Sequence, residues 1–404
     1  MQTLAILGRQ PAIGLAELES LLGADKITPL QGGGVLLDVE STYIPFSRLG
    51  GTVKLGDVLT TLDTVKWKDI DKFIVSASKE HSRHVPDGKL TIGLSVYGLD
   101  VSRAELEKTA LSIKKQVKST GRPVRIVPNK SPEISTPQII HNKLTGSNGW
   151  ELVFYRNGDT TILMRTTNIQ DIESYTARDQ ARPMRDARVG MLPPKLAQII
   201  INLAKGKIER EVGSEKLEGR TSGVQTILDP FCGTGVILQE SLLMGMGVNG
   251  TDLEPRMIEY SQANLDWFIK ELGLQNRQVK LNLGDATSYK WEKGFATVAC
   301  EGYLGLPFAH MPSPDHLQES IQASNTVAKG FLKNLGSQVD KGFRFCIGLP
   351  AWHLPNSVKH VPCLEELQKL GWQRVRFEHA HPADLVYRRE DQVVGRELVV
   401  LIKL

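Results

Sequence analysis

The stretch VQTILDPFCGTGVILQE, residues 224 to 240, joins two apolar runs through a turn that contains two glycines. The first run, residues 224–228, has the length and the β-branched residues of a buried strand. The second run follows the glycines and has the composition of a helix. A strand that passes through a glycine turn into a helix is typical of α/β domains that bind a ligand at the end of a sheet.

Alternation of strand and helix continues from residue 178 to the end of the sequence and predicts a parallel sheet covered by helices on both faces. We expect helices between the strands, starting with 193–204. The last two strands are joined by a short connection, which predicts an antiparallel hairpin. The charged segment 205–223 is expected to be a surface loop. The seven expected strands are residues 224–228, 247–251, 278–283, 295–300, 343–349, 373–379 and 395–403.

Two smaller α+β units are predicted before this α/β domain, which gives a division into residues 1–64, 65–175 and 176–404. The length of 404 residues supports several domains, because one hydrophobic core seldom serves a chain of this size. Their expected strands are residues 3–7, 35–39, 90–98, 124–128, 151–157 and 160–166, and their expected helices are a stretch around Leu15 to Leu22, 69–79 and 103–119.

Composition excludes several classes of protein. Hydrophobic residues make up 41% and charged residues 23% of the sequence, as in ordinary globular proteins, and no apolar run approaches the ~20 residues of a membrane-spanning helix. The N-terminal residues lack the pattern of a secretion signal, and the four cysteines are too dispersed for a disulfide scaffold. We expect a cytoplasmic protein with no membrane contact and no bound metal.

Positive charge is concentrated in one segment. The net charge is only +4, but residues 101–143 contain 9 Lys and Arg against 3 Glu. A solvated helix face would explain such a run, and so would a surface that contacts the phosphates of a nucleic acid. Its place next to an α/β domain favours the second interpretation.

Three acids follow three consecutive expected strands. Asp229 precedes the glycines, Asp252 ends the second strand and Asp285 follows the third. Each could serve simply as a helix cap or turn residue. Together they would meet at one edge of a parallel sheet, where Asp229 would repel the pyrophosphate of a nicotinamide cofactor but attract the ammonium group of S-adenosylmethionine. Asp252 would bind the ribose hydroxyls and Asp285 the adenine amino group.

These residues carry a resemblance to a known family. DPFCGTG resembles the first cofactor motif of amino-group methyltransferases, and the chain resembles the tRNA guanine-10 N2-methyltransferases of archaea and eukaryotes and their bacterial relatives. The resemblance implies an α/β, Rossmann-like, seven-stranded S-adenosylmethionine-dependent methyltransferase domain preceded by α+β ferredoxin-like and THUMP domains. It also implies that the segment 178–204 helps to enclose the cofactor, although Arg182-Pro183 and Pro193-Pro194 could equally start a helix and pack. The expected cofactor-binding residues are Asp229, Phe231, Gly233, Thr234, Gly235, Asp252, Asp285, Ala286 and Pro194.

The catalytic motif departs from the family. The family normally ends its fourth strand with Asp or Asn, two prolines and an aromatic residue, which grip the acceptor amine and stack on its base. Here ACEGYLGLPF, residues 299–308, stands in that place. We expect Glu301 to orient the amine and Tyr303 or Phe308 to stack on the base. Glu is one methylene longer than Asp, which displaces the carboxylate by about 1 Å unless the backbone compensates, and such a displacement can cost ~100-fold in rate.

Several functions compete on this sequence. The leading interpretation is methylation of a base amine, with guanine N2 in tRNA as the first choice and ribosomal RNA or adenine N6 of DNA as other acceptors. A catalytically inactive RNA-binding protein would also explain the altered motif, whereas a nicotinamide-dependent dehydrogenase is disfavoured by Asp229 and by the absence of GxGxxG. Cys232 and Cys300 are poor candidates for a nucleophile. Eukaryotic relatives use a helper subunit and archaeal ones act alone, and the sequence is compatible with either.

Overall fold

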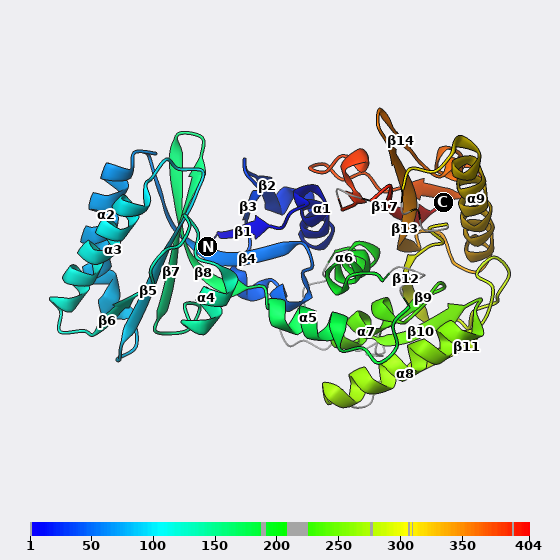
Figure 1. The fold of residues 1–404 in the computed structure, drawn as a ribbon, viewed down its shortest axis with the longest axis horizontal. Coiled ribbons are helices and arrows are strands. Elements are labelled where there is room, and N and C mark those ends of the chain that lie inside the picture. The colour runs from blue at the N-terminus through cyan, green and yellow to red at the C-terminus, as the bar shows by residue number, and fades with distance from the viewer. Residues whose placement is uncertain are drawn as a thin grey trace. The chain divides into compact units, whose positions relative to one another are not determined.

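The computed structural model forms two compact units (Figure 1). The first comprises residues 1–11, 25–47 and 52–173, and the second comprises residues 12–24, 48–51 and 174–404. A short N-terminal helix and the segment 48–51 therefore belong with the C-terminal part of the chain. The predicted division into three domains stays a prediction. The structure describes residues 2–186, 191–207, 225–274, 278–305, 308, 310–389 and 392–404, so most of the expected loop 205–223 lies outside the described residues.

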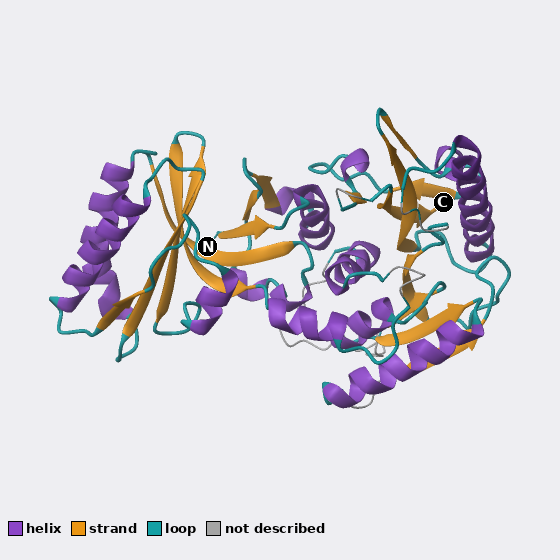
Figure 2. Cartoon of the chain, in the orientation of Figure 1, coloured by secondary structure: helices purple, strands orange, loops and turns teal. Residues whose placement is uncertain are grey.

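The first unit is built on an eight-stranded sheet of order β2-β3-β1-β4-β8-β7-β5-β6. Only β5 pairs with its neighbours in parallel. Helices α2 and α3 pack their apolar residues against β5 and β7, and Figure 2 shows both helices on one face of the sheet. The elements are β1 (Thr3–Leu7), β2 (Ile27–Pro29), β3 (Gly34–Leu37), β4 (Thr52–Leu62), α2 (Trp67–His81), β5 (Leu90–Tyr97), α3 (Arg103–Lys118), β6 (Val124–Ile126), α4 (Thr136–His141), β7 (Gly149–Asn157) and β8 (Thr160–Ile169).

Helix α3 shows how the sequence specifies an element of this unit. Ser102 caps its N-terminus by accepting a hydrogen bond from the main-chain amide of Glu105, whose carboxylate bonds back to Ser102. Its buried residues recur at helical spacing, and its polar face carries lysines. The basic face thus stays in solvent, as expected for residues 103–119.

The second unit contains the predicted α/β sheet, of order β11-β10-β9-β12-β13-β17-β15. The strands from β11 to β13 are parallel, and β17 runs antiparallel to both β13 and β15. All seven predicted strands have a counterpart, although β15 covers only the start of the expected strand 373–379, and the antiparallel pairing of the last two is confirmed. They are β9 (Thr226–Asp229), β10 (Gly247–Asp252), β11 (Val279–Leu283), β12 (Phe295–Glu301), β13 (Arg344–Leu354), β15 (Trp372–Arg374) and β17 (Val394–Lys403).

Two intervals differ from the prediction of a helix between consecutive strands. No α-helix joins β11 to β12, where residues 284–294 form turns, and none joins β13 to β15. Strand β13 runs to Leu354, turns at Pro355-Asn356 and returns as β14 (Ser357–Lys359), followed by a 3-10 helix over Pro362–Glu366. A Pro-Asn pair favours a tight turn over a helix, so the hairpin uses residues that a helix would have needed. A second short strand, β16 (Val386–Tyr387), pairs with β17.

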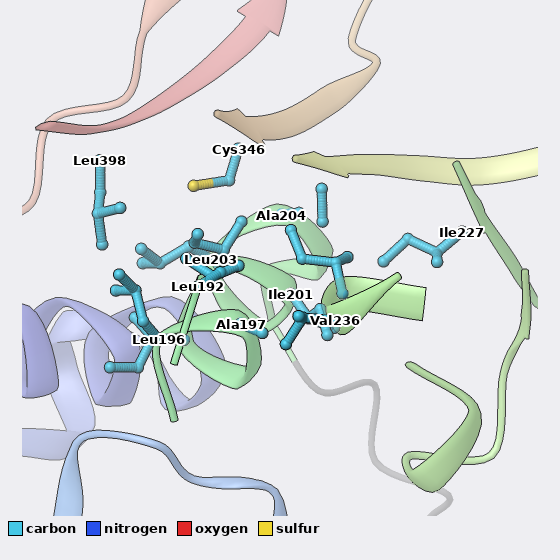
Figure 3. Packing of buried hydrophobic residues seen from close by; sticks show 14 of the residues in the cluster. Leu192, Leu196, Ala197, Ile201, Leu203, Ala204, Ile227, Val236, Cys346 and Leu398 are labelled. Atoms are coloured by element: carbon cyan, nitrogen blue, oxygen red, sulfur yellow. The ribbon is translucent and has the colours of Figure 1, made fainter. Parts of the chain in front are cut away.

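Helix α6 (Pro194–Lys205) lies at the centre of the larger core of this unit. It is buried on nearly every side, and its apolar residues pack with residues of β9, α7 (Val236–Leu243), β13 and β17 (Figure 3). Two buried amides on it are polar links: Gln198 donates to Glu240 of α7, and Asn202 donates to Glu17 of α1 (Pro11–Leu22). Helices α5 (Ile172–Gln180), α8 (Pro255–Glu271) and α9 (Pro314–Gly336) complete the layer structure.

Three general expectations concern membrane-spanning helices, disulfide bonds and metal ions. Among the described residues, no helix is both long enough and apolar enough to cross a membrane. All four cysteines are buried and free of disulfide bonds. No group of acidic, His or Cys side chains within the described ranges could hold a metal ion.

Candidate active site

The glycine turn is held by hydrogen bonds within the chain. The amide of Cys232 donates to the carbonyl of Thr251 at 3.0 Å, and that of Gly233 donates to Oδ2 of Asp252 at 2.8 Å. The amide of Gly235 donates to the carbonyl of Cys232, and that of Phe231 to Oδ1 of Asp229. Four amides are therefore already satisfied. The turn presents carboxylates to a ligand more than it presents unpaired amides.

Both glycines of the turn have left-handed backbone conformations. Gly235, with φ of 86°, directly precedes α7, and a Cβ at this position would lie 2.9 Å from Oγ of Ser261. Gly233 has φ of 50°, but a Cβ there would meet its nearest atom only at 4.0 Å. Gly235 is thus required by the packing of the turn on α8, whereas Gly233 leaves the main chain open to a ligand.

The three predicted acids come together at the carboxyl edge of the sheet. Asp229 ends β9, Asp252 ends the neighbouring β10, and Asp285 follows β11, whose Leu283 pairs with Asp252. The Asp252 carboxylate accepts the amides of Gly233 and Glu254 and therefore ties the turn to its own strand end. Oδ1 of Asp285 accepts from the amide and hydroxyl of Thr287, while its Oδ2 has no partner in the part of the chain that the structure describes.

Negative charge accumulates around Asp229, whose side chain belongs to a residue only 2% exposed. Burial raises the pKa of its carboxyl well above the usual value, and the nearby Asp252 and Glu301 raise it further. Burial also raises the pKa of Asp252. Within the described ranges, no Lys, Arg or His forms an ion pair with either aspartate. The carboxyl edge of the sheet therefore has uncompensated carboxylates, and a cationic ligand could supply the missing positive charge.

The remaining predicted cofactor residues have mixed positions. Phe231 is half-buried and packs edge-to-face on Phe331, with ring centroids 5.2 Å apart. Thr234 and Ala286 are buried, and their carbonyls accept from Asn264 and Asn334. Pro194 is the buried first residue of α6. These residues form a scaffold around the glycine turn, and the ring of Phe231 lies next to the turn.

Asn264 of α8 is a residue that sequence reasoning missed. Its Nδ2 donates to the carbonyls of Thr234 and Met184, and its Oδ1 accepts the amide of Met184. It therefore links the glycine turn to the segment that follows Arg182-Pro183. The signal in the sequence was weak: a polar residue on the buried face of an amphipathic helix.

Glu301 is bound by an arginine that the sequence did not suggest. Glu301 ends β12 beside Gly348 of β13, and its Oε1 accepts a hydrogen bond from Nε of Arg396 on β17. The two side chains are 18% and 11% exposed. Burial raises the pKa of the Glu301 carboxyl, and the Arg396 guanidinium opposes that shift.

Comparison with known proteins places this geometry in context. No protein-family model matches the chain. Three curated relatives are each named tRNA (guanine(10)-N2)-dimethyltransferase. The one from Pyrococcus abyssi is 35% identical over 145 residues, 35% of this chain and 37% of the relative. That from Methanothermobacter thermautotrophicus is 36% identical over 115 residues, 27% of this chain and 28% of the relative.

The relative from Methanocaldococcus jannaschii is 26% identical over 205 residues, 51% of this chain and 49% of the relative. The chain thus matches half or less of the length of each relative. Among solved structures, TrmN from Thermus thermophilus superposes with a TM-score of 0.50 at 15% identity, over 100% of both chains. At that identity the likeness shows a shared fold.

The two aromatic candidates at the catalytic motif differ in exposure. Tyr303 is 41% exposed, whereas Phe308 is half-buried and packs against the apolar cluster that contains Phe331. Tyr303 is therefore the ring better able to meet a base. The cysteines near the site are unsuited to nucleophilic attack, since burial raises the pKa of both Cys232 and Cys300 well above the usual value.

The residues at the carboxyl edge fit a ligand that is both cationic and partly apolar. Asp229 and Asp252 lack cationic partners among the described residues, and Gly233 leaves room for close approach. Leu253 and Leu283, beside Asp252, are 64% and 55% exposed. Exposed leucines next to acids provide apolar walls for a planar ring, and sequence reasoning did not identify them.

Proposed function

We propose that the protein transfers a methyl group from S-adenosylmethionine to the exocyclic amine of a base in tRNA, with guanine N2 as the acceptor. The observation that carries the proposal is the gathering of Asp229, Asp252 and Glu301 at one sheet edge, where only Glu301 has a cationic partner among the described residues. A ligand with a sulfonium and an ammonium group would supply the missing positive charge.

In this proposal each acid binds a different part of the cofactor. Asp229 faces the ammonium group, Asp252 accepts from the ribose hydroxyls, and the free Oδ2 of Asp285 accepts from the adenine amino group. Leu253 and Leu283 pack on the adenine ring. The lone pairs of Asp252 that are not used by Gly233 and Glu254 suffice for the ribose, because a carboxylate accepts about four hydrogen bonds.

The acceptor amine is assigned to the end of β12. Glu301 accepts one N–H of the amine through Oε2, and Tyr303 stacks on the base. When bound, S-adenosylmethionine would supply an electrophilic methyl group: the nitrogen lone pair would form the N–C bond as the C–S electron pair moves to sulfur, and the methylated nitrogen would release its extra proton to water. An ionised Glu301 would stabilise the positive charge that develops on nitrogen.

The choice of tRNA and guanine is supported by the names of the three relatives and by charge. Lys108, Lys115 and Lys118 are exposed on α3, and Arg125 is exposed on β6. Such residues bind phosphates and give salt-dependent affinity for RNA. We assign residues 1–64 to a ferredoxin-like domain and residues 65–175 to a THUMP domain that would position the tRNA. We also propose that the protein acts in the cytoplasm.

The test is the methylation of tRNA by Glu301→Ala, measured by mass spectrometry of nucleosides. We expect a loss of turnover of about 100-fold or more with unchanged affinity for S-adenosylhomocysteine in calorimetry. Glu319→Ala is the matched control, because Glu319 is exposed on α9 of the same unit. Turnover of Glu301→Ala at the wild-type rate would show that Glu301 has no role in orienting the amine.

A catalytically inactive RNA-binding protein is the second candidate. The observation in its favour is that Arg396 already occupies one oxygen of the acid that would grip the amine. This candidate predicts that wild-type protein binds S-adenosylmethionine and tRNA but incorporates no methyl group into any RNA. Incorporation by the wild type excludes it.

A further inference from the structure

We infer that Arg396 is a positioning residue that holds Glu301 in the rotamer in which Oε2 meets the acceptor amine. This inference rests on the proposed methyl transfer. It addresses the departure of the catalytic motif from that of the family the sequence resembles: in this chain a longer acid stands without the two prolines that normally follow it in that family. The question is what fixes a glutamate that has one more rotatable bond than an aspartate.

The backbone after Glu301 cannot accommodate the usual proline. The amide of Gly302 donates to the carbonyl of Gly348 at 2.9 Å, so β12 remains hydrogen-bonded to β13 one residue beyond Glu301. A proline has no amide hydrogen and would lose this bond. A Cβ at position 302 would also lie 3.1 Å from Cδ1 of Ile347 and 3.3 Å from Cδ2 of Leu349. Rigidity at this strand end therefore comes from sheet pairing.

Arg396 supplies the constraint on the side chain. Arg396 lies on β17, which pairs with β13, and β13 in turn pairs with β12. The backbone of Arg396 is therefore fixed relative to Glu301 by the hydrogen bonds of two strand pairs. Its Nε donates to Oε1 of Glu301, and both side chains are largely buried. A charge-assisted hydrogen bond from a guanidinium has defined direction, which restricts the carboxylate and leaves Oε2 for another donor.

The pair also affects the charge of Glu301. Burial raises the pKa of the Glu301 carboxyl, and Arg396 on β17 opposes this shift by favouring the ionised form. The charge of Glu301 in turn raises the pKa of the buried Asp229 on the neighbouring strand β9. Without the guanidinium, the pKa of Glu301 would rise further, and more of the acid would be protonated at neutral pH. A protonated acid would stabilise a cationic nitrogen less.

The experiment compares Arg396→Met, Arg396→Lys, Glu301→Gln and the double variant Arg396→Met/Glu301→Gln. We expect Arg396→Met to lower kcat about 100-fold, with little change in KM for tRNA or in affinity for S-adenosylhomocysteine. The acidic limb of its pH-rate profile should move to higher pH. Arg396→Lys should recover part of the rate, and the double variant should be no slower than Glu301→Gln.

The matched control is Arg374→Met. Arg374 forms a similar, partly buried pair with Glu397 in the same sheet, with Nη1 2.8 Å from Oε1. This control should lose stability without a change in the pH-rate profile. If Arg396→Met has the same profile and kcat as the control, or if its defect adds fully to that of Glu301→Gln, Arg396 is structural only. If wild-type protein methylates no tRNA, the proposed function fails first and the inference falls with it.

Discussion

Replacing Asp229 by asparagine should weaken binding of the cofactor and strengthen the fold of the unliganded protein. Asparagine is nearly isosteric with aspartate, and its Oδ1 can still accept the amide of Phe231, now 3.1 Å from Oδ1 of Asp229. The change therefore removes charge with little change in shape. In the proposed site that charge contacts the ammonium group, and a charge-assisted hydrogen bond contributes about 1.5–3 kcal/mol. We expect the Kd for S-adenosylhomocysteine to rise roughly 10- to 150-fold.

The effect on stability has the opposite sign. The pKa of Asp229 is raised in the folded protein, so over the pH range between the unfolded and folded values the folded state holds a proton that the unfolded chain has released. Stability is lost as pH rises through this range. An asparagine side chain is neutral at every pH, so the Asp229→Asn variant should be more stable than wild type near and above neutral pH, by about 2–4 °C in Tm for each kcal/mol gained.

The assays are calorimetric titration with S-adenosylhomocysteine and thermal unfolding of the unliganded protein at pH 6 and pH 8. Asp340→Asn is the control, since Asp340 is exposed before β13 and carries the same charge. Wild-type affinity in Asp229→Asn would refute the assignment of this carboxylate to the cofactor. A fall in Tm at pH 8 would refute the argument from its buried charge.

Two other predictions concern the scaffold of the second unit. Gly235→Ala should lower the free energy of unfolding by more than the ~1–2 kcal/mol that a left-handed alanine costs, because its Cβ would meet Oγ of Ser261. Gly245→Ala is the control, because Gly245 has φ of 87° and a Cβ there would meet no atom within 4 Å. Chemical denaturation of the control measures the cost of the backbone conformation alone. Burial raises the pKa of Glu17 to about 7, so this group makes the fold less stable as pH rises from about 4.5 to 7. The stability of wild type relative to Glu17→Gln should therefore fall by roughly 2–3 kcal/mol between pH 5 and pH 8, and a pH-independent difference would contradict this.

The sheet of the second unit was accessible to sequence reasoning because its information is local. Each strand is a short apolar run, and parallel strands place their carboxyl ends at one edge, so acids that follow such runs must converge. Asp229, Asp252 and Asp285 illustrate this. The Pro355-Asn356 pair is also a local turn signal, but the expectation of a helix in every gap before the last one led to the wrong prediction there.

Glu17 shows what local patterns leave out. Between the apolar residues of α1 it reads as a solvent-facing glutamate, yet it is fully buried. It accepts the amides of Gly50 and Gly51 and the side chain of Asn202. Its partners lie 33 to 185 residues away in sequence, so no spacing rule relates them. The same reason explains why α1 belongs to the second unit, contrary to the simple order of domains.

The pairing of Arg396 with Glu301 could not be predicted from the sequence for the same reason, since the two residues lie 95 apart. This pairing gives the altered motif a structural explanation. Read alone, EGYLG lacks the prolines and the short acid of the family that the sequence resembles, as a decayed site would. In the fold, the amide of Gly302, which a proline would lack, forms a hydrogen bond within the sheet. The carboxylate of the longer acid, Glu301, accepts a hydrogen bond from the guanidinium of Arg396 on β17. A decayed site does not explain an acid, a paired arginine and two carboxylates without cationic partners among the described residues in one place, because each buried charge costs stability. Their presence together is explained if the edge of the sheet binds a cation that neutralises it.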